Sequence, residues 1–273
     1  MYTDQASLPI AIFDSGVGGL TVAKVLKEKH PNESIIYLAD TSNRPFGTKN
    51  EETLFSIIKK NCEFLKTQKI KALLVACHTA CSLGLEIYKE LQIPVYGITS
   101  SSIETLKRNQ EDQQLVILAT ERTIKSQLYQ KALASINHRF PPVFIANSCI
   151  EKMIESIETD ESVISSELSG SLIEITNKER LTILLGCTHF PIYKKHIHKV
   201  IGTSSQLIDP ADDFVDFIME NLTKLGLKTP SKTSVDEYIV TSDAEVFKQK
   251  FYHYFSESLK KTNHFFNLSC AII

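Results

Sequence analysis

Short runs of apolar residues alternate with longer amphipathic stretches along most of the chain. The short runs have the length of buried strands, and Gly, Pro, Asn, Asp or Ser residues stand near their ends. The longer stretches repeat apolar residues every three or four positions, which is the spacing of one helix face. In residues 51–66, for example, Leu54, Ile57, Ile58 and Leu65 fall on one side of a helix. Strands and helices that alternate in this way predict an α/β fold.

The predicted elements form two series with the same layout. The first has strands at 9–13, 35–39, 72–76 and 94–98, and helices at 20–29, 51–66 and from the third strand to about residue 91. The second has strands at 114–119, 142–146, 181–185 and 206–208, and helices at 123–133, 148–158, 162–176 and 211–225. A strand at 238–243 and a helix from Ala244 follow an exposed connection at 226–234. The shared order and spacing predict two similar lobes that face each other.

Length and composition limit the classes of protein to consider. The chain has 273 residues, enough for one large domain or two smaller ones, and 42% of them are hydrophobic. The 32 acidic residues against 30 Lys and Arg give a net charge of −2, so we expect binding to neither nucleic acid nor an anionic membrane. No apolar stretch is long enough to cross a bilayer, and the first residues lack the pattern of a signal peptide. We therefore expect a cytoplasmic protein with reduced cysteines.

Two of the cysteines occupy matching places in the two series. Cys77 ends a strand in the segment LLVACHTACS (73–82), and Cys187 ends a strand in the segment TILLGCTHFP (182–191). Sites in parallel sheets lie beyond the carboxyl ends of the strands, so two facing lobes would bring both thiols to one cleft. Each thiol also precedes a predicted helix start, whose N–H groups and dipole favour an anion.

Two thiols on opposite faces of a small substrate can exchange a proton at one carbon atom. The ordinary pKa of a thiol is about 8.5, and a helix N-terminus or a nearby cation lowers this pKa. A thiolate removes the proton while the opposite thiol supplies another, and this inverts a stereocentre through a planar intermediate. Such chemistry needs no cofactor if the carbanion is stabilised electrostatically. The paired cysteines therefore predict a cofactor-independent racemase.

Other interpretations of the same residues stay open. A free cysteine is often a small packing residue, which is the role we expect for Cys81. Cys77, Cys81, Cys187, His78 and His189 include the ligand types of a zinc site, but their spacing does not make a complete zinc pattern. A cysteine hydrolase is conceivable, although it needs only one thiol. We expect no metal.

The segment FDSGVGGLTV (13–22) supplies a second candidate part of the site. Its glycines, Gly16, Gly18 and Gly19, fit neither the G-x-G-x-x-G dinucleotide motif nor a P-loop. We expect them to allow positive φ in a tight turn between a strand and a helix. Asp14 at the strand end either serves the site, by holding an ammonium or orienting a base, or only caps the helix.

Several motifs together resemble the glutamate racemases of the aspartate/glutamate racemase family. They are DSGVGGLTV (14–22), PFG (45–47), ACHTA (76–80), TIKSQLY (123–129), LLGCTHFP (184–191) and VTSDAEVF near the end, in the same order over most of the chain. The resemblance implies cofactor-independent exchange between L- and D-glutamate, which supplies D-glutamate for peptidoglycan, and usually a homodimer. It also implies two pseudo-symmetric three-layer α/β lobes with mostly parallel sheets and the active site in the cleft between them. The first lobe would comprise residues 1–99 and 210–273, and the second residues 100–209.

The resemblance also implies roles for the motif residues. Cys187 would remove the proton from L-glutamate and Cys77 from D-glutamate. Asp14 and His189 would assist the neighbouring thiols, and Glu155 matches an acidic position of the family. The implied substrate-binding residues are Asp14, Ser15, Phe46, Gly47, His78, Thr79, Thr188 and His189.

The sequence departs from the family pattern at a few positions. His78 stands where Asn is usual, Phe46 where Tyr is usual, Ala119-Thr120 in place of Gly-Thr, and residues 146–148 in place of Ala-Cys-Pro. An imidazole can donate to a carboxylate, but it titrates near neutrality, and its protonated form would favour a Cys77 thiolate. Alternative functions are therefore a racemase of aspartate or another acidic amino acid, and a non-catalytic relative that binds a ligand or a partner protein.

Overall fold

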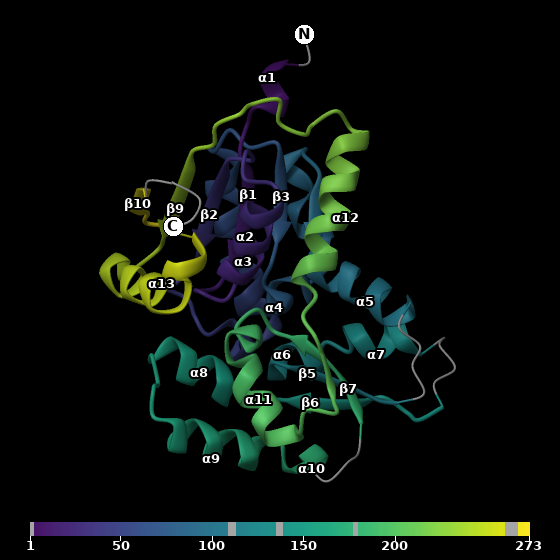
Figure 1. The fold of residues 1–273 in the computed structure, drawn as a ribbon. Coiled ribbons are helices and arrows are strands. Elements are labelled where there is room, and N and C mark those ends of the chain that lie inside the picture. The colour runs from purple at the N-terminus through teal and green to yellow at the C-terminus, as the bar shows by residue number, and fades with distance from the viewer. Residues whose placement is uncertain (1–2, 109–112, 135–138, 177–179, 260–266) are drawn as a thin grey trace.

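Two parallel sheets organise the chain (Figure 1). The computed structural model describes residues 3–108, 113–134, 139–176, 180–259 and 267–273. Within these ranges one sheet has six strands and the other has four, and every described pairing of strands is parallel. The predicted α/β class with parallel sheets is confirmed.

The first sheet combines strands from both ends of the chain. Its members are β1 (Ile10–Asp14), β2 (Ile35–Ala39), β3 (Ala72–Val75), β4 (Val95–Gly97), β9 (Asp236–Val240) and β10 (Asn267–Cys270). They lie in the order β10-β9-β2-β1-β3-β4. Every residue of β1, β2 and β3 is buried, as expected for parallel strands covered on both faces, which is why these segments are almost wholly apolar.

Five helices of more than two turns surround this sheet. They are α2 (Leu20–Lys29), α3 (Glu51–Lys66), α5 (Ile98–Arg108), α12 (Ala211–Lys224) and α13 (Ala244–Leu259) (Figure 1). α12 packs against α2 and α5, and α13 packs against α2 and β10. Asn50 accepts a hydrogen bond from the Thr53 N–H at 2.8 Å and so begins α3. In the described part of the chain, no helix is both long and apolar enough to cross a membrane.

Buried ion pairs attach the later segments to the first sheet. Lys27 on α2 donates to Asp236 at the start of β9 at 3.0 Å. Lys71 donates to Glu33 at 2.5 Å, and the other oxygen of Glu33 accepts from the Thr229 N–H at 2.8 Å. An unpaired charge in these buried places would be costly, so the pairs hold β9 and the connection before it in position.

The second sheet lies below the first in Figure 1. Its strands are β5 (Gln114–Ala119), β6 (Val143–Ala146), β7 (Leu181–Gly186) and β8 (Gln206–Ile208), in the order β6-β5-β7-β8. The helices around it are α6 (Glu121–Lys125), α7 (Leu128–Leu133), α8 (Cys149–Glu155), α9 (Glu161–Ser171), α10 (Ile173–Thr176) and α11 (Lys194–Ile201).

Most predicted strands and the longest helices fall where expected, but three predicted helices are wrong. The helix expected after the third strand is a short α4 (His78–Cys81) followed by the 3₁₀ segment η2 (Leu85–Leu91), because Gly84 between them has a φ of 80°. The helix expected at 123–133 is divided into α6 and α7 by Gln127, which has a φ of 57°. The helix expected at 162–176 ends at Ser171 and continues as α10.

A few elements lie outside the sequence predictions. They are α1 (Thr3–Ala6), α5, α11, β10 and the 3₁₀ segments η1 (Phe46–Thr48) and η3 (Phe190–Tyr193). The segments of α5 and α11 contain few apolar residues, since α5 is rich in Ser and Thr and α11 in Lys and His. The strand predicted at 238–243 is β9, which begins and ends earlier than predicted. These differences arise because packing overrides weak local patterns.

Candidate active site

A small cavity lies where the carboxyl ends of the central strands of the two sheets meet. Its wall consists of Ser15, Gly47, Cys77, His78, Thr79, Thr120, Glu151, Cys187, Thr188 and His189. The free space is about 10 Å³, which is room for roughly one water molecule. The two predicted cysteines therefore face the same enclosed space, in a form too tight to hold an amino acid.

Cys77 follows β3 and stands immediately before α4. Its side chain is buried, and its Sγ donates to Ser15 Oγ at 3.8 Å. Burial raises the pKa of the Cys77 thiol well above its usual value, and the Asp14 carboxylate raises it further. The hydrogen bond from the Ala80 N–H acts in the opposite direction but does not outweigh burial. The expectation that a helix start would leave an acidic thiol here is wrong, because a four-residue helix cannot offset full burial.

Cys187 follows β7 and has a different polar partner. Its Sγ lies 3.8 Å from His189 Nδ1. Burial raises the pKa of the Cys187 thiol, while the hydrogen bond and the charge of His189 lower it. The segment that follows is the 3₁₀ turn η3, so the partner of this thiol is an imidazole and not the start of an α-helix.

His189 connects Cys187 to a carboxylate. Its Nε2 lies 2.9 Å from Glu155 Oε1, which leaves Nδ1 facing the thiol. Burial lowers the pKa of His189, but the hydrogen bonds with Cys187 and Glu155 outweigh it and raise the pKa well above its usual value. Burial outweighs His189 at Cys187 and leaves the pKa of that thiol above its usual value, but the imidazolium gives Cys187 a cationic partner that Cys77 lacks.

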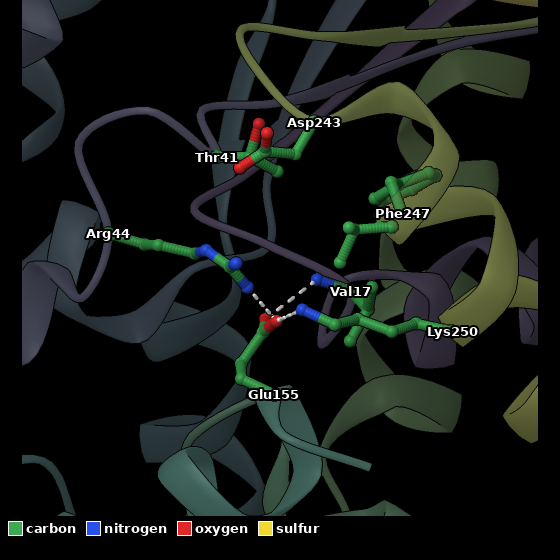
Figure 2. Close-up of a pocket in the computed structure, with 8 residues that line it drawn as sticks. Val17, Thr41, Arg44, Glu155, Asp243, Phe247 and Lys250 are labelled. Carbon is green, nitrogen blue, oxygen red and sulfur yellow. Dashed lines mark hydrogen bonds and ion pairs between the residues drawn. The ribbon is translucent and has the colours of Figure 1, made fainter.

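Glu155 is held by groups from four other segments, and Figure 2 shows the contacts with Arg44, Val17 and Lys250. Its Oε2 accepts from Lys250 Nζ of α13 at 2.5 Å and from Arg44 Nη1 of the loop after β2. Its Oε1 accepts from the Val17 N–H at 3.3 Å as well as from His189. Burial raises the pKa of Glu155, but the hydrogen bond of His189 and the charges of His189, Arg44 and Lys250 hold it far below the usual range. Glu155 is thus an anion held in place by partners from segments of both sheets.

Asp14 lies behind the cavity wall and not in it. It is fully buried, and its two oxygens accept from the Gly16 N–H and from Thr188 Oγ1, each at 3.0 Å. Burial raises the pKa of Asp14, and the charge of His189 lowers it. The predicted contact of Asp14 with substrate stays a prediction, since Asp14 is not among the residues that line the cavity. Asp14 instead holds Thr188 and the turn that presents Ser15.

The turn at residues 16–19 requires glycine for a different reason from the one expected. Positive φ is found at Gly84, Gly202 and Gly226 among the described glycines, and none of these belongs to the turn. A Cβ atom at Gly18 would lie 2.5 Å from both His189 Nδ1 and Thr188 Oγ1. Position 18 therefore needs glycine because Thr188 and His189, which follow β7 of the second sheet, approach its backbone closely, and not because of a left-handed conformation.

His78 is a neutral group in the cavity wall. It is fully buried, and neither of its ring nitrogens has a hydrogen-bond partner among the described residues. Burial lowers the pKa of His78 to about 3. The expectation that His78 titrates near neutrality is wrong for this closed form, because no neighbouring carboxylate compensates the loss of solvent. His78 therefore places two buried ring nitrogens without a described partner next to Cys77.

Phe46 does not line the cavity, although the sequence placed it there. Its ring is 1% exposed and lies 6.3 Å from the ring of Phe13 in the core. An aromatic ring without a hydroxyl has no polar atom to satisfy and packs well in this place. Of the predicted pair only Gly47 faces the cavity, where a Cβ would meet Thr120 Cβ at 2.9 Å.

Two wall residues were missed as binding candidates. Thr120 directly follows β5, as Ser15 follows β1, so the position after each strand was an available signal. Its Oγ1 lies 2.8 Å from Thr79 Oγ1, a contact that joins the two sides of the cavity. Glu151 is on the first turn of α8, and nothing in its local sequence indicates that it faces the thiols.

The cavity has no metal-binding arrangement within the described ranges. No group of three or more His, Cys, Asp and Glu side chains there could hold a metal ion. Cys81, which belongs to the zinc interpretation, is buried away from the wall, with its Sγ 3.4 Å from the Val75 carbonyl oxygen.

Two parallel α/β units with a thiol from each in a shared cavity define a racemase-type fold and site. Residues 21–217 match the family described as Asp/Glu/Hydantoin racemase. The chain belongs to this family, and it is an amino-acid racemase, an isomerase of the cofactor-independent kind.

Individual relatives agree with this assignment. A glutamate racemase from Pediococcus pentosaceus is 33% identical over 243 residues, which cover 88% of this chain and 92% of the relative. The crystal structure of a glutamate racemase isoform from Bacillus anthracis has a TM-score of 0.87, 26% identity and 97% coverage of both chains. That of the Francisella tularensis glutamate racemase in complex with D-glutamate has a TM-score of 0.86 and 26% identity, with coverage of 97% of this chain and 98% of that one.

Proposed function

We propose that this racemase interconverts L- and D-glutamate by proton transfer between Cα and the thiols of Cys77 and Cys187. The observation that carries the proposal is that both sulfur atoms face one cavity, each with its own polar partner. The choice of substrate is supported by the relatives named glutamate racemase and by the D-glutamate complex of one of them.

The unequal surroundings of the thiols suggest which of them starts as the base. The His189 imidazolium stabilises a thiolate at Cys187 and offsets part of the effect of burial there, whereas burial and the Asp14 carboxylate both oppose a thiolate at Cys77. In the L-to-D direction, the Cys187 thiolate takes the Cα proton and the Cys77 S–H gives its proton to the opposite face. In the reverse direction the two thiols exchange these roles, and after each turnover the protons must be redistributed.

The intermediate carbanion is stabilised by groups that the wall already holds in place. Hydroxyl groups of Ser15, Thr79, Thr120 and Thr188 face the cavity together with His189. Fixed donors in a space without water stabilise developing charge more strongly than solvent does. They also leave hydrogen-bonding positions for the ammonium and carboxylate groups of the substrate.

The closed cavity also suggests that the molecule opens to admit substrate. We propose two lobes, residues 1–99 with 210–273 and residues 100–209, that separate and close around the amino acid. We further propose a cytoplasmic homodimer that supplies D-glutamate for peptidoglycan, on the strength of the resemblance to bacterial glutamate racemases.

Circular dichroism of amino-acid solutions tests the proposed activity directly. Purified protein without added cofactor should bring the signal of L-glutamate and the opposite signal of D-glutamate to zero. Aspartate is the second candidate substrate, because the matched family includes aspartate racemases. A faster decay with aspartate than with glutamate would reject the proposed substrate and keep the proposed chemistry.

A further inference from the structure

Glu151 is a buried carboxyl group in the wall of the cavity. It is 7% exposed and lies on α8, four residues before Glu155. Residues four apart share one face of a helix, so α8 directs two carboxyl groups toward the catalytic residues. Glu155 has its partners in His189, Arg44 and Lys250. Glu151 has no role in the proton transfer described above.

The wall offers no basic Lys or Arg side chain to an acidic substrate. None of the described wall residues is a lysine or an arginine. Arg44 and Lys250, which bind Glu155, are not in the wall, and Figure 2 shows both of them pointing at Glu155. A dicarboxylic amino acid must therefore have at least one carboxylate bound by neutral donors.

The charged neighbours of Glu151 come from several elements. His189, after β7, favours its ionised form, whereas Asp14 after β1 and Glu155 on the same helix oppose it. Arg44, from the loop after β2, adds a weaker attraction. Burial is the largest effect and raises the pKa of Glu151 above the usual carboxyl range.

The remaining titratable groups near Glu151 are two on neighbouring elements and two uncharged ones in the cavity wall. Glu167 of α9 interacts with Cys149, on another part of α8. Tyr193 of η3 donates to the Glu158 carbonyl oxygen. His78 and the Cys77 thiol face the same cavity without carrying a charge in this closed form.

The balance of charge decides the state of Glu151 when substrate is present. If Glu151 is ionised, it joins Asp14, Glu155 and the proposed Cys187 thiolate as a fourth anion against three cations, so the cluster has a net negative charge that repels an anion. Glutamate brings two carboxylates and one ammonium. A protonated Glu151 removes this excess negative charge and also provides an O–H donor in the wall.

We propose that Glu151 takes up a proton when glutamate binds and donates it in a hydrogen bond to a substrate carboxylate. This inference rests on the proposed glutamate racemase activity. Its consequence is that affinity decreases as pH rises through the pKa of Glu151 in the free enzyme. The KM should then rise by up to about tenfold for each pH unit, because binding requires one additional proton.

The pH profile of KM in Glu151→Gln separates this role from a purely structural one. The amide donates at every pH, so KM in this variant should change less than about twofold where the wild-type KM rises about tenfold. Glu174→Gln, an exposed position on α10, is the matched control and should follow the wild type. A flat wild-type profile, or an unchanged rise in Glu151→Gln, would overturn the proposal. A large increase of KM in Glu151→Gln at every pH would also overturn it, because it would mean that an ionised Glu151 binds the ammonium group.

Calorimetry tests the same proposal on the unmodified enzyme. Racemic glutamate, which undergoes no net reaction, is titrated into wild-type protein in phosphate and in Tris buffer at several pH values. The difference between the buffers should report proton uptake that increases from zero toward one per site as pH rises. Racemisation without any proton uptake would reject this inference alone, whereas the absence of racemisation would reject the proposed function.

Discussion

Replacement of Gly18 by alanine should displace residues that line the catalytic cavity, because the new Cβ atom would clash with His189 and Thr188. The new Cβ would lie 2.5 Å from His189 Nδ1 and 2.5 Å from Thr188 Oγ1, where ordinary contacts are 3.4–4 Å. The His189 ring or the turn must therefore move by roughly 1 Å. Overpacking of this kind costs about 1–3 kcal/mol, which corresponds to a decrease in Tm of about 2–12 °C for a chain of this size.

Activity should fall more than stability does. His189 Nδ1 is the atom that faces Cys187, and a displacement of about 1 Å at a catalytic group can reduce a rate about 100-fold. We therefore expect Gly18→Ala to be folded at 25 °C, with kcat for glutamate racemisation reduced about 100-fold. Thermal unfolding and racemisation, both followed by circular dichroism, measure the two effects on the same sample.

Gly170→Ala is the matched control for this substitution. Gly170 lies in α9, and a Cβ atom there meets nothing within 4 Å. Alanine should stabilise this helix by about 0.5–1 kcal/mol and leave kcat unchanged. If Gly18→Ala had the Tm and kcat of the wild type, the close approach of the turn to His189 would not exist as described.

Four further substitutions test the chemistry of the site. Cys77→Ser and Cys187→Ser should each reduce kcat about 10²–10⁴-fold in the circular dichroism assay; wild-type activity in either would remove that thiol from the mechanism. Glu155→Gln should lower the raised pKa of His189, so that His189 loses its proton at a lower pH and no longer stabilises a Cys187 thiolate at neutral pH. Alkylation of Cys187 by iodoacetamide should therefore be slower at neutral pH, as mass spectrometry of the peptide that contains Cys187 would reveal. Because burial lowers the pKa of His78 to about 3, His78→Asn should leave the shape of the pH–rate profile between pH 5 and 8 unchanged, and loss of a wild-type inflection near pH 6.5 would contradict a neutral His78.

The sequence predicted the elements whose signal is local and strong. The strands β2, β5 and β8 and the helices α2 and α3 have the predicted bounds. The rule that sites lie beyond strand ends was enough to select both cysteines and their neighbours, because a parallel sheet places all of its strand ends at one edge.

Interactions between distant segments were not predictable. Glu155 was recognised only through family resemblance, and its contacts with Arg44 and Lys250 depend on how three separate elements pack. The reason for Gly18 and the position of Glu151 depend on the same packing. Shifts of pKa that follow from burial share this limitation, because local sequence does not specify how deeply a side chain is buried.

Deuterium incorporation at low conversion tests the two-thiol account most directly. L-glutamate is incubated with the enzyme in D₂O, and the reaction is stopped when about five per cent has been converted. The two enantiomers are then separated, and the deuterium content of each is measured by mass spectrometry. Two thiols on opposite faces predict D-glutamate with one deuterium at Cα, while the remaining L-glutamate keeps its original hydrogen. Early D-glutamate that retains the substrate hydrogen would mean that a single group serves both faces, and would contradict the account.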